Sequence, residues 1–165
     1  MNHDKIRVLL GHDQPQDIIG RAIARFTWLH PVCHSKAAFW FPDGRYQIWE
    51  SRRDCGVIKR DPDPEGRDRY TIWTEVDLPN PEAALAFAYR QEGKDYDNPF
   101  WKFLFRVTEE SRKASGRWFC SEFIFQLCAE GGLRLLRILK AFMVSPSLLF
   151  SSPLQEGPFR PPWNY

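Results

Sequence analysis

Apolar positions in the first forty residues follow first a strand pattern and then a helix pattern. The run IRVLL at 6–10 predicts a short buried strand, and Gly-His-Asp at 11–13 predicts the turn after it. We expect Asp13 to cap a helix over about 15–28, where apolar residues recur at helical spacing until Pro31 ends it. The chain is therefore predicted to begin with a strand and an amphipathic helix.

The next apolar runs predict a β-hairpin. KAAFWF at 36–41 and RYQIWE at 45–50 are rich in aromatic and β-branched residues, and they flank Pro-Asp-Gly at 42–44. Phe41-Pro42-Asp43-Gly44 suits a type I turn with glycine in the left-handed conformation, which gives a three-residue loop with a bulge.

The length of this loop decides which face of the hairpin carries the acidic residue Glu50. In the bulged register Lys36 lies opposite Glu50, and Glu50 becomes the diagonal neighbour of His34 on the same face. A two-residue turn at Asp43-Gly44 would shift the pairing by one residue and send Glu50 to the other face.

Farther along, the pattern predicts two more strands and three helices. The strands are 56–60 and 70–76, and the helices are 82–92 after an Asn80 cap, 99–107, and 120–130 before Gly131-Gly132. The segment at 133–144 is basic and apolar by turns, and the chain after it is proline-rich and mostly irregular. We predict an α+β fold in a single domain over 1–165, with a core at about 6–150 and a proline-rich tail at 151–165.

Composition narrows the classes of function. Of the 165 residues 43 % are hydrophobic, and 23 basic side chains nearly balance 21 acidic ones, a balance that gives no support to nucleic-acid binding. The sequence lacks a secretory signal and a run of about 18 apolar residues, so we expect a soluble cytoplasmic protein. The four cysteines are then expected as free thiols. We expect no metal site and no cofactor, because the cluster His30, Cys33 and His34 has no second Cys/His pair at finger spacing.

Cys120 is the candidate nucleophile. It begins the predicted helix 120–130, on the same apolar stripe as Cys128. The stripe alone favours a buried core cysteine. Position in the first helical turn favours chemistry, because unpaired N–H groups and the helix dipole stabilise a thiolate there.

His34 is the candidate base, and Glu50 is the group that would orient its imidazole. A thiolate and an imidazolium with a third polar group form the usual arrangement for cysteine acyl transfer. Each residue also has an ordinary structural interpretation: His34 as a histidine at a strand end, and Glu50 as a solvated charge.

A set of motifs in one order resembles a known family. HSKAAFWF, RYQIWES with CGV, KDYD, WFCSEF and MVSPSLL together resemble the circularly permuted papain-like cysteine hydrolases of the NlpC superfamily. The similarity is to the YiiX-like branch, which includes the lecithin:retinol acyltransferase-like proteins and in which the histidine strand precedes the cysteine helix. Cys33, Ser35 and Lys36 depart from the residues usual around that histidine.

The resemblance implies a papain-like fold with a small antiparallel sheet and a catalytic cysteine at a helix N-terminus. It implies that Cys120 attacks a carbonyl, His34 transfers the proton and Glu50 orients His34, while Tyr96 and Ser121 are candidates for substrate or oxyanion contacts. Tyr96 has an equal interpretation as a packing aromatic.

Two substrate classes follow from the resemblance, namely peptide-type amides such as peptidoglycan stem peptides, and lipid or lipoyl-type esters and amides. The basic apolar segment within 133–150 is a candidate for peripheral lipid contact, or else a core element whose cations reach outward. The alternative function is a non-catalytic module that binds an acyl chain or a peptide in the same groove.

Overall fold

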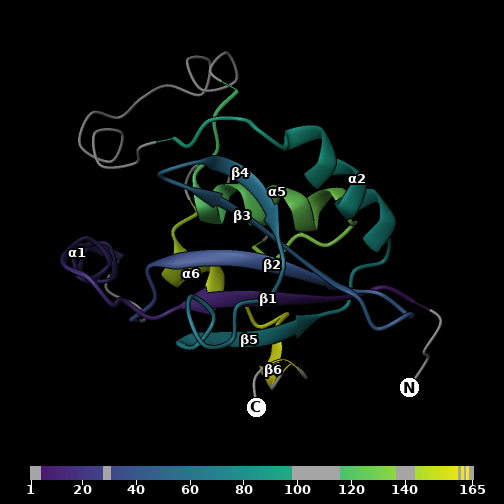
Figure 1. Ribbon diagram of the computed structural model, residues 1–165, viewed down its shortest axis with the longest axis horizontal. Helices are drawn as coiled ribbons and strands as arrows, with labels where there is room; N and C mark the ends of the chain where they lie inside the picture. Colours follow the sequence, from purple (N-terminus) through teal and green to yellow (C-terminus); the bar gives the residue numbers. More distant parts are fainter. Residues whose placement is uncertain are drawn as a thin grey trace.

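The computed structural model describes residues 5–27, 31–97, 116–136, 144–159, 161 and 163. These residues contain a six-stranded antiparallel sheet in the order β4-β3-β2-β1-β5-β6 (Figure 1). The strands are β1 (Arg7–Asp13), β2 (His34–Trp40), β3 (Tyr46–Arg52), β4 (Gly56–Arg60), β5 (Thr71–Val76) and β6 (Glu156–Phe159). The predicted α+β class is thus confirmed in its coarse form, as a mixed structure of helices with an antiparallel sheet.

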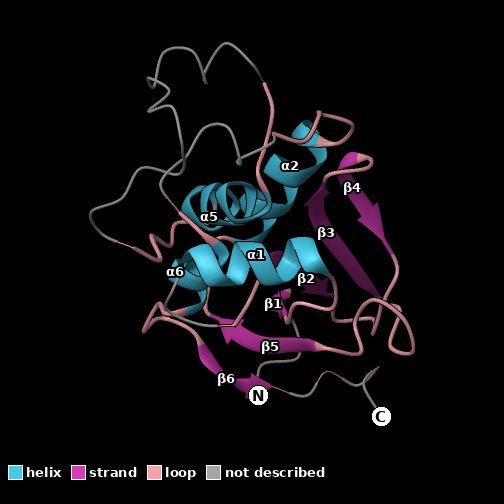
Figure 2. Ribbon diagram, turned by 90° about the vertical axis from the view of Figure 1, so that its left-hand side faces the viewer, coloured by secondary structure: helices cyan, strands magenta, loops and turns pink. Residues whose placement is uncertain are grey.

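Four helices are present among the described residues. They are α1 (Ile18–Thr27), α2 (Pro81–Gln91), α5 (Cys120–Glu130) and α6 (Pro146–Phe150). Figure 2 shows α2, α5 and α6 gathered on one side of the sheet, while Figure 1 places α1 beyond the end where β1 stops and β2 begins. In the part of the chain that the structure describes, no helix has the length and apolar character needed to cross a membrane.

The main core lies between the sheet and the two helices α2 and α5. From α5, Phe123, Ile124 and Leu127 are fully buried, and they join Phe39 and Trp49 of the central hairpin in one apolar cluster. Burial of aromatic and aliphatic side chains of this size stabilises the folded state by about 1.5–3 kcal/mol each. The packing therefore fixes α5 firmly on the β2–β3 hairpin.

The β2–β3 hairpin has the predicted bulged register. Gly44 N–H donates to Phe41 O (3.0 Å), Phe41 N–H donates to Arg45 O (2.9 Å), and Gly44 has a φ of +84°. Lys36 lies directly opposite Glu50 in the ladder. The three-residue loop is confirmed, and Glu50 is on the face of the sheet that carries His34.

The predicted turn at 11–13 was wrong, because β1 continues through it to Asp13. Gly11 permits this continuation: a Cβ there would lie 2.8 Å from the Trp73 ring and 2.9 Å from the Lys36 side chain. The glycine thus serves close packing across three strands rather than a turn. Asp13 does not cap the helix either, since it is Asp17 Oδ1 that accepts from Gly20 N–H (2.6 Å) ahead of the first turn of α1.

The segment after residue 144 is more regular than predicted. Ser145 Oγ accepts from Leu148 N–H (3.2 Å) and caps the short helix α6, and residues 156–159 add β6 to the edge of the sheet. The Asn80 cap of α2 and the bounds of α5 agree with prediction. The predicted helix 99–107 lies outside the described residues, as does 137–143 of the basic segment.

Candidate active site

His34 and Glu50 form a hydrogen-bonded ion pair at the start of β2. The distance from His34 Nε2 to Glu50 Oε2 is 2.8 Å, and the Glu50 side chain is 4 % exposed while that of His34 is 20 % exposed. A buried carboxylate fixes the ring orientation of a histidine and determines which ring nitrogen keeps its proton. With Nε2 held by Glu50, the remaining ring nitrogen, Nδ1, is the one directed to other partners.

Hydrogen bonds to Trp118, which lies just before α5, hold the start of this helix near His34. Ser51, the residue after Glu50, donates its hydroxyl to Trp118 O (2.7 Å). Asp97 N–H donates to Trp118 O (3.0 Å), and Trp118 N–H donates to Asp95 O (3.0 Å), so the strand-like segment around Tyr96 runs beside the residues that precede Cys120. The cysteine is placed by this framework together with the packing of α5.

Cys120 lies within electrostatic reach of His34. Burial alone lowers the pKa of His34, but the charge of Cys120 and a side-chain hydrogen bond with it, followed by the same interactions with Glu50, raise the pKa to about 10. The imidazole is therefore protonated at neutral pH, between a sulfur and a carboxylate. The structure thus joins His34 and Glu50 by a hydrogen bond and places Cys120 within electrostatic reach of His34.

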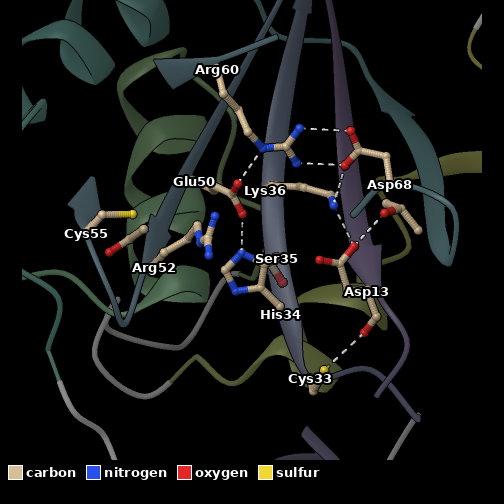
Figure 3. Close-up of polar contacts among 12 residues, drawn as sticks. Asp13, Cys33, His34, Ser35, Lys36, Glu50, Arg52, Cys55, Arg60 and Asp68 are labelled. Atoms are coloured by element: carbon tan, nitrogen blue, oxygen red, sulfur yellow. Dashed lines mark hydrogen bonds and ion pairs between the residues drawn. The ribbon is translucent and has the colours of Figure 1, made fainter. Parts of the chain in front are cut away.

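Behind this group lies a chain of buried ion pairs that the sequence did not reveal (Figure 3). Arg60 Nε donates to Glu50 Oε1 (2.6 Å), and its other nitrogens donate to both carboxylate oxygens of Asp68 (2.7 and 2.9 Å). The fully buried Lys36 ammonium then bridges Asp68 and Asp13, at 2.7 Å from each. Negative and positive side chains therefore alternate along this network of ion pairs, from Asp13 at one end to His34 at the other.

This network keeps Glu50 ionised. Burial by itself raises the pKa of Glu50, but His34 and then Arg60 outweigh it and hold the pKa well below its usual range. The pKa of Asp68 is lowered in the same way, because Arg60 and Lys36 outweigh its burial. Glu50 therefore accepts hydrogen bonds from both of its neighbours and presents a fixed charge to His34.

The two candidates for substrate or oxyanion contacts, Tyr96 and Ser121, differ in their surroundings. Tyr96 is half-buried with its ring at 5.8 Å from that of Phe119, and burial, followed by the charge of Cys120, raises its pKa. Tyr96 thus lies within electrostatic reach of the cysteine. Ser121 is fully buried and donates its hydroxyl to Val144 O, so its side chain is engaged in a structural hydrogen bond and does not face a substrate.

The N-terminus of α5 offers backbone donors instead. Its N-cap residue is Phe119, whose side chain has no acceptor and makes no capping hydrogen bond. The Phe119 side chain therefore does not bind the N–H groups of the first turn. These groups point out of the helix at its N-terminus, where the helix dipole is positive. An oxyanion that forms beside Cys120 can be stabilised there.

The remaining cysteines are not equivalent to Cys120. All four are free thiols, as predicted. Burial raises the pKa of Cys128 to about 12, and burial followed by the charge of Asp13 raises the pKa of Cys33 to about 12. Cys55 is exposed in the β3–β4 loop. Among the described residues, no group of three or more His, Cys, Asp or Glu side chains is placed to hold a metal ion.

His12 is a second buried histidine, and it is structural. Its Nε2 bonds to Gln155 Oε1 (2.7 Å), which also accepts from the Thr74 hydroxyl (2.6 Å). Burial lowers the pKa of His12 to about 4, so the ring is neutral at physiological pH. Because Gln155 Oε1 can only accept, His12 Nε2 carries the proton, and the pair ties the C-terminal segment to β1.

Comparison with known proteins adds no family to these observations: no family model matches the chain, and neither does any curated protein.

Proposed function

We propose that the protein is a cysteine hydrolase or acyltransferase of permuted papain-like fold, with Cys120 as nucleophile, His34 as base and Glu50 as the residue that orients His34. The observation that carries the proposal is the His34–Glu50 hydrogen bond at 2.8 Å, with Cys120, the first residue of α5, within electrostatic reach of the same imidazole. The order of a histidine strand before a cysteine helix, packed on an antiparallel sheet, supports the fold assignment.

The proposed reaction proceeds in two acyl transfers. The Cys120 sulfur attacks the substrate carbonyl carbon, and backbone N–H groups at the start of α5 stabilise the oxyanion. His34 gives its proton to the leaving amine or alcohol as the carbonyl re-forms, which leaves a thioester on Cys120. His34 then takes a proton from water, or from an acceptor nucleophile, which attacks the thioester and releases the acid or the transferred acyl group together with the free sulfur.

The substrate is proposed as an amide or an ester with an acyl group of peptide or lipid type. Peptide-type amides and acyl lipids share the carbonyl chemistry of the proposed reaction. The alternative is a non-catalytic module that binds an acyl chain or a peptide. It is favoured by one observation, the low exposure of Cys120, which is 1 %. Turnover requires the sulfur to become accessible in solution.

Thiol labelling separates the two functions. The native protein is treated with iodoacetamide at pH 7, and the rate at each cysteine is followed by peptide mass spectrometry. We expect Cys120 to react faster than Cys55, although Cys55 is the exposed thiol, because the imidazolium of His34 stabilises the reactive thiolate. Cys33 and Cys128 are the slow internal references, since thiols with a pKa of about 12 are almost fully protonated at pH 7.

Replacement of His34 provides the control. In His34→Ala the excess reactivity of Cys120 over Cys55 should disappear, while the rate at Cys55 stays unchanged. The buried histidine His12 provides a matched variant. His12→Asn removes an imidazole that contacts neither Cys120 nor Glu50 through any described hydrogen bond. This variant should keep the higher reactivity of Cys120 over Cys55. A wild-type protein in which Cys120 reacts no faster than Cys55 would favour the binding module over the enzyme.

A further inference from the structure

Arg52 is the cation nearest to His34 in the strand register. Lys36 pairs with Glu50, and Arg52, the last residue of β3, lies two residues beyond Glu50, toward the end of the hairpin where β2 begins at His34. Residues two apart in a strand share a face, so Arg52 lies on the face that carries Glu50. Figure 3 shows the Arg52 guanidinium beside the pair formed by His34 and Glu50.

Arg52 differs from Lys36 and Arg60, the cations described above, in the exposure of the carboxylate that it contacts. Lys36 and Arg60 each contact two carboxylates, and the Asp68 side chain that they share is completely buried. Arg52 instead pairs with Asp54 at 2.7 Å, and the Asp54 side chain is 63 % exposed. An exposed carboxylate two residues away holds a guanidinium only weakly, since water and salt screen the pair.

Arg52 is largely covered but keeps some contact with solvent. Its partner in the β4 ladder is Gly56, against which the backbone of Lys94 packs, and 20 % of the Arg52 side chain remains exposed. A planar guanidinium with fixed donors suits two-point binding of a carboxylate. The position beside His34 would put such a carboxylate next to the acyl group that Cys120 attacks.

We infer that Arg52 forms a subsite for an anionic group of the substrate, so that the protein acts on carboxylate-bearing acyl groups in preference to neutral ones. This inference rests on the proposed function, because it names the substrate class of the same site. On binding, the substrate carboxylate replaces Asp54 as the partner of Arg52.

Two small alkylating reagents test the subsite without knowledge of the natural substrate. Iodoacetate and iodoacetamide both transfer a substituted methyl group to sulfur with loss of iodide, and they differ in charge. The ratio of the two rates at Cys120, divided by the same ratio for free glutathione in the same buffer, reports attraction of an anion to the site. Cys55 is unsuitable as the reference here, because its thiol donates to Asp54 Oδ1 (3.3 Å). We expect Arg52→Gln to lower this normalised ratio by about two- to fivefold, the range for a partly exposed ion pair.

Three variants make the experiment specific. Arg52→Lys should restore part of the ratio, and Asp54→Asn should raise it, because the competing carboxylate is gone. Arg45→Gln is the matched control: Arg45 also pairs with an exposed aspartate two residues away, Asp43 at 2.6 Å, but it precedes β3 at the opposite end of the strand. It should leave the ratio unchanged.

The outcomes separate the two proposals. If Cys120 shows His34-dependent reactivity with iodoacetamide, and Arg52→Gln leaves the normalised ratio unchanged, the subsite is overturned and the proposed enzyme stands. If Cys120 shows no His34-dependent reactivity in the wild type, the proposed function fails, and the subsite fails with it. The circular dichroism spectrum and the urea midpoint of Arg52→Gln, compared with wild type, verify that this variant keeps its fold.

Discussion

Lys36 and Glu50 are directly opposed in the β2–β3 ladder, yet each is bonded to partners from other elements. The Lys36 ammonium contacts Asp68 and Asp13, while the Glu50 carboxylate contacts His34 and Arg60. Three carboxylates, one lysine and one arginine sum to one negative charge, which the protonated imidazole of His34 offsets. Burial makes that balance important, because an uncompensated charge in the interior costs several kcal/mol.

We predict that Glu50→Gln keeps the His34 imidazole but removes the charge of the group that orients it. The amide keeps the shape of the side chain but loses the charge that favours the imidazolium, so the pKa of His34 should fall from about 10. The labelling rate of Cys120 should fall by about tenfold or more. The His34 pKa is measured by NMR titration of the ring protons, and the rate is measured with iodoacetamide at pH 7.

The matched control is Glu75→Gln. It removes a carboxylate that forms a partly buried ion pair with Arg7 at 2.6 Å, on β5, without touching His34. It should change neither the His34 pKa nor the rate at Cys120. Equal labelling rates of Cys120 in Glu50→Gln and the wild type would remove Glu50 from the catalytic group.

The alternation of residues along the chain was enough to predict that Glu50 lies on the face of the sheet that carries His34. The Pro42-Asp43-Gly44 loop fixed the hairpin register, and the register put Glu50 on the face of His34. The supporting ions were missed for a physical reason. Asp68 lies in a charged loop that is typical of solvated surface, and only the folded chain brings it to Lys36 and Arg60. Local patterns do not report such long-range pairing.

The raised pKa of His34 predicts a pH dependence of stability. The folded protein holds the His34 proton up to a pKa of about 10, whereas the unfolded chain releases it near 6.5. The contribution to the free energy of unfolding is therefore complete below about pH 6.5 and is lost as the pH rises toward 10. Urea unfolding at a series of pH values should show a steeper alkaline loss in wild type than in His34→Gln. Parallel curves for the two proteins would contradict the assigned pKa.

Gly11 explains why β1 is longer than predicted, and it provides a test of the packing around the ion network. A Cβ at this position would lie within 3 Å of Trp73, Lys36 and Thr71. We expect Gly11→Ala to destabilise the protein by about 1–3 kcal/mol, the usual cost of overpacking. Chemical denaturation measures this loss. Gly44→Ala is the contrasting variant: it meets open space and costs only the strain of its positive φ, about 1 kcal/mol.

Arg60 is predicted to position Glu50 through geometry as well as charge. Its guanidinium binds Glu50 with one nitrogen and both oxygens of Asp68 with the others, and an ammonium group does not reproduce this planar two-point contact with Asp68. Arg60→Lys keeps the positive charge, so the pKa of His34 should stay near 10. The Glu50 carboxylate loses a fixed hydrogen bond, however, and the labelling rate at Cys120 should fall by about three- to tenfold.

Arg60→Gln also removes the charge and leaves two buried carboxylates partly unpaired, so it should lose about 3–5 kcal/mol of stability. A purely electrostatic role for Arg60 would be established if Arg60→Lys retained the full wild-type labelling rate, and the bridging geometry would then be unnecessary.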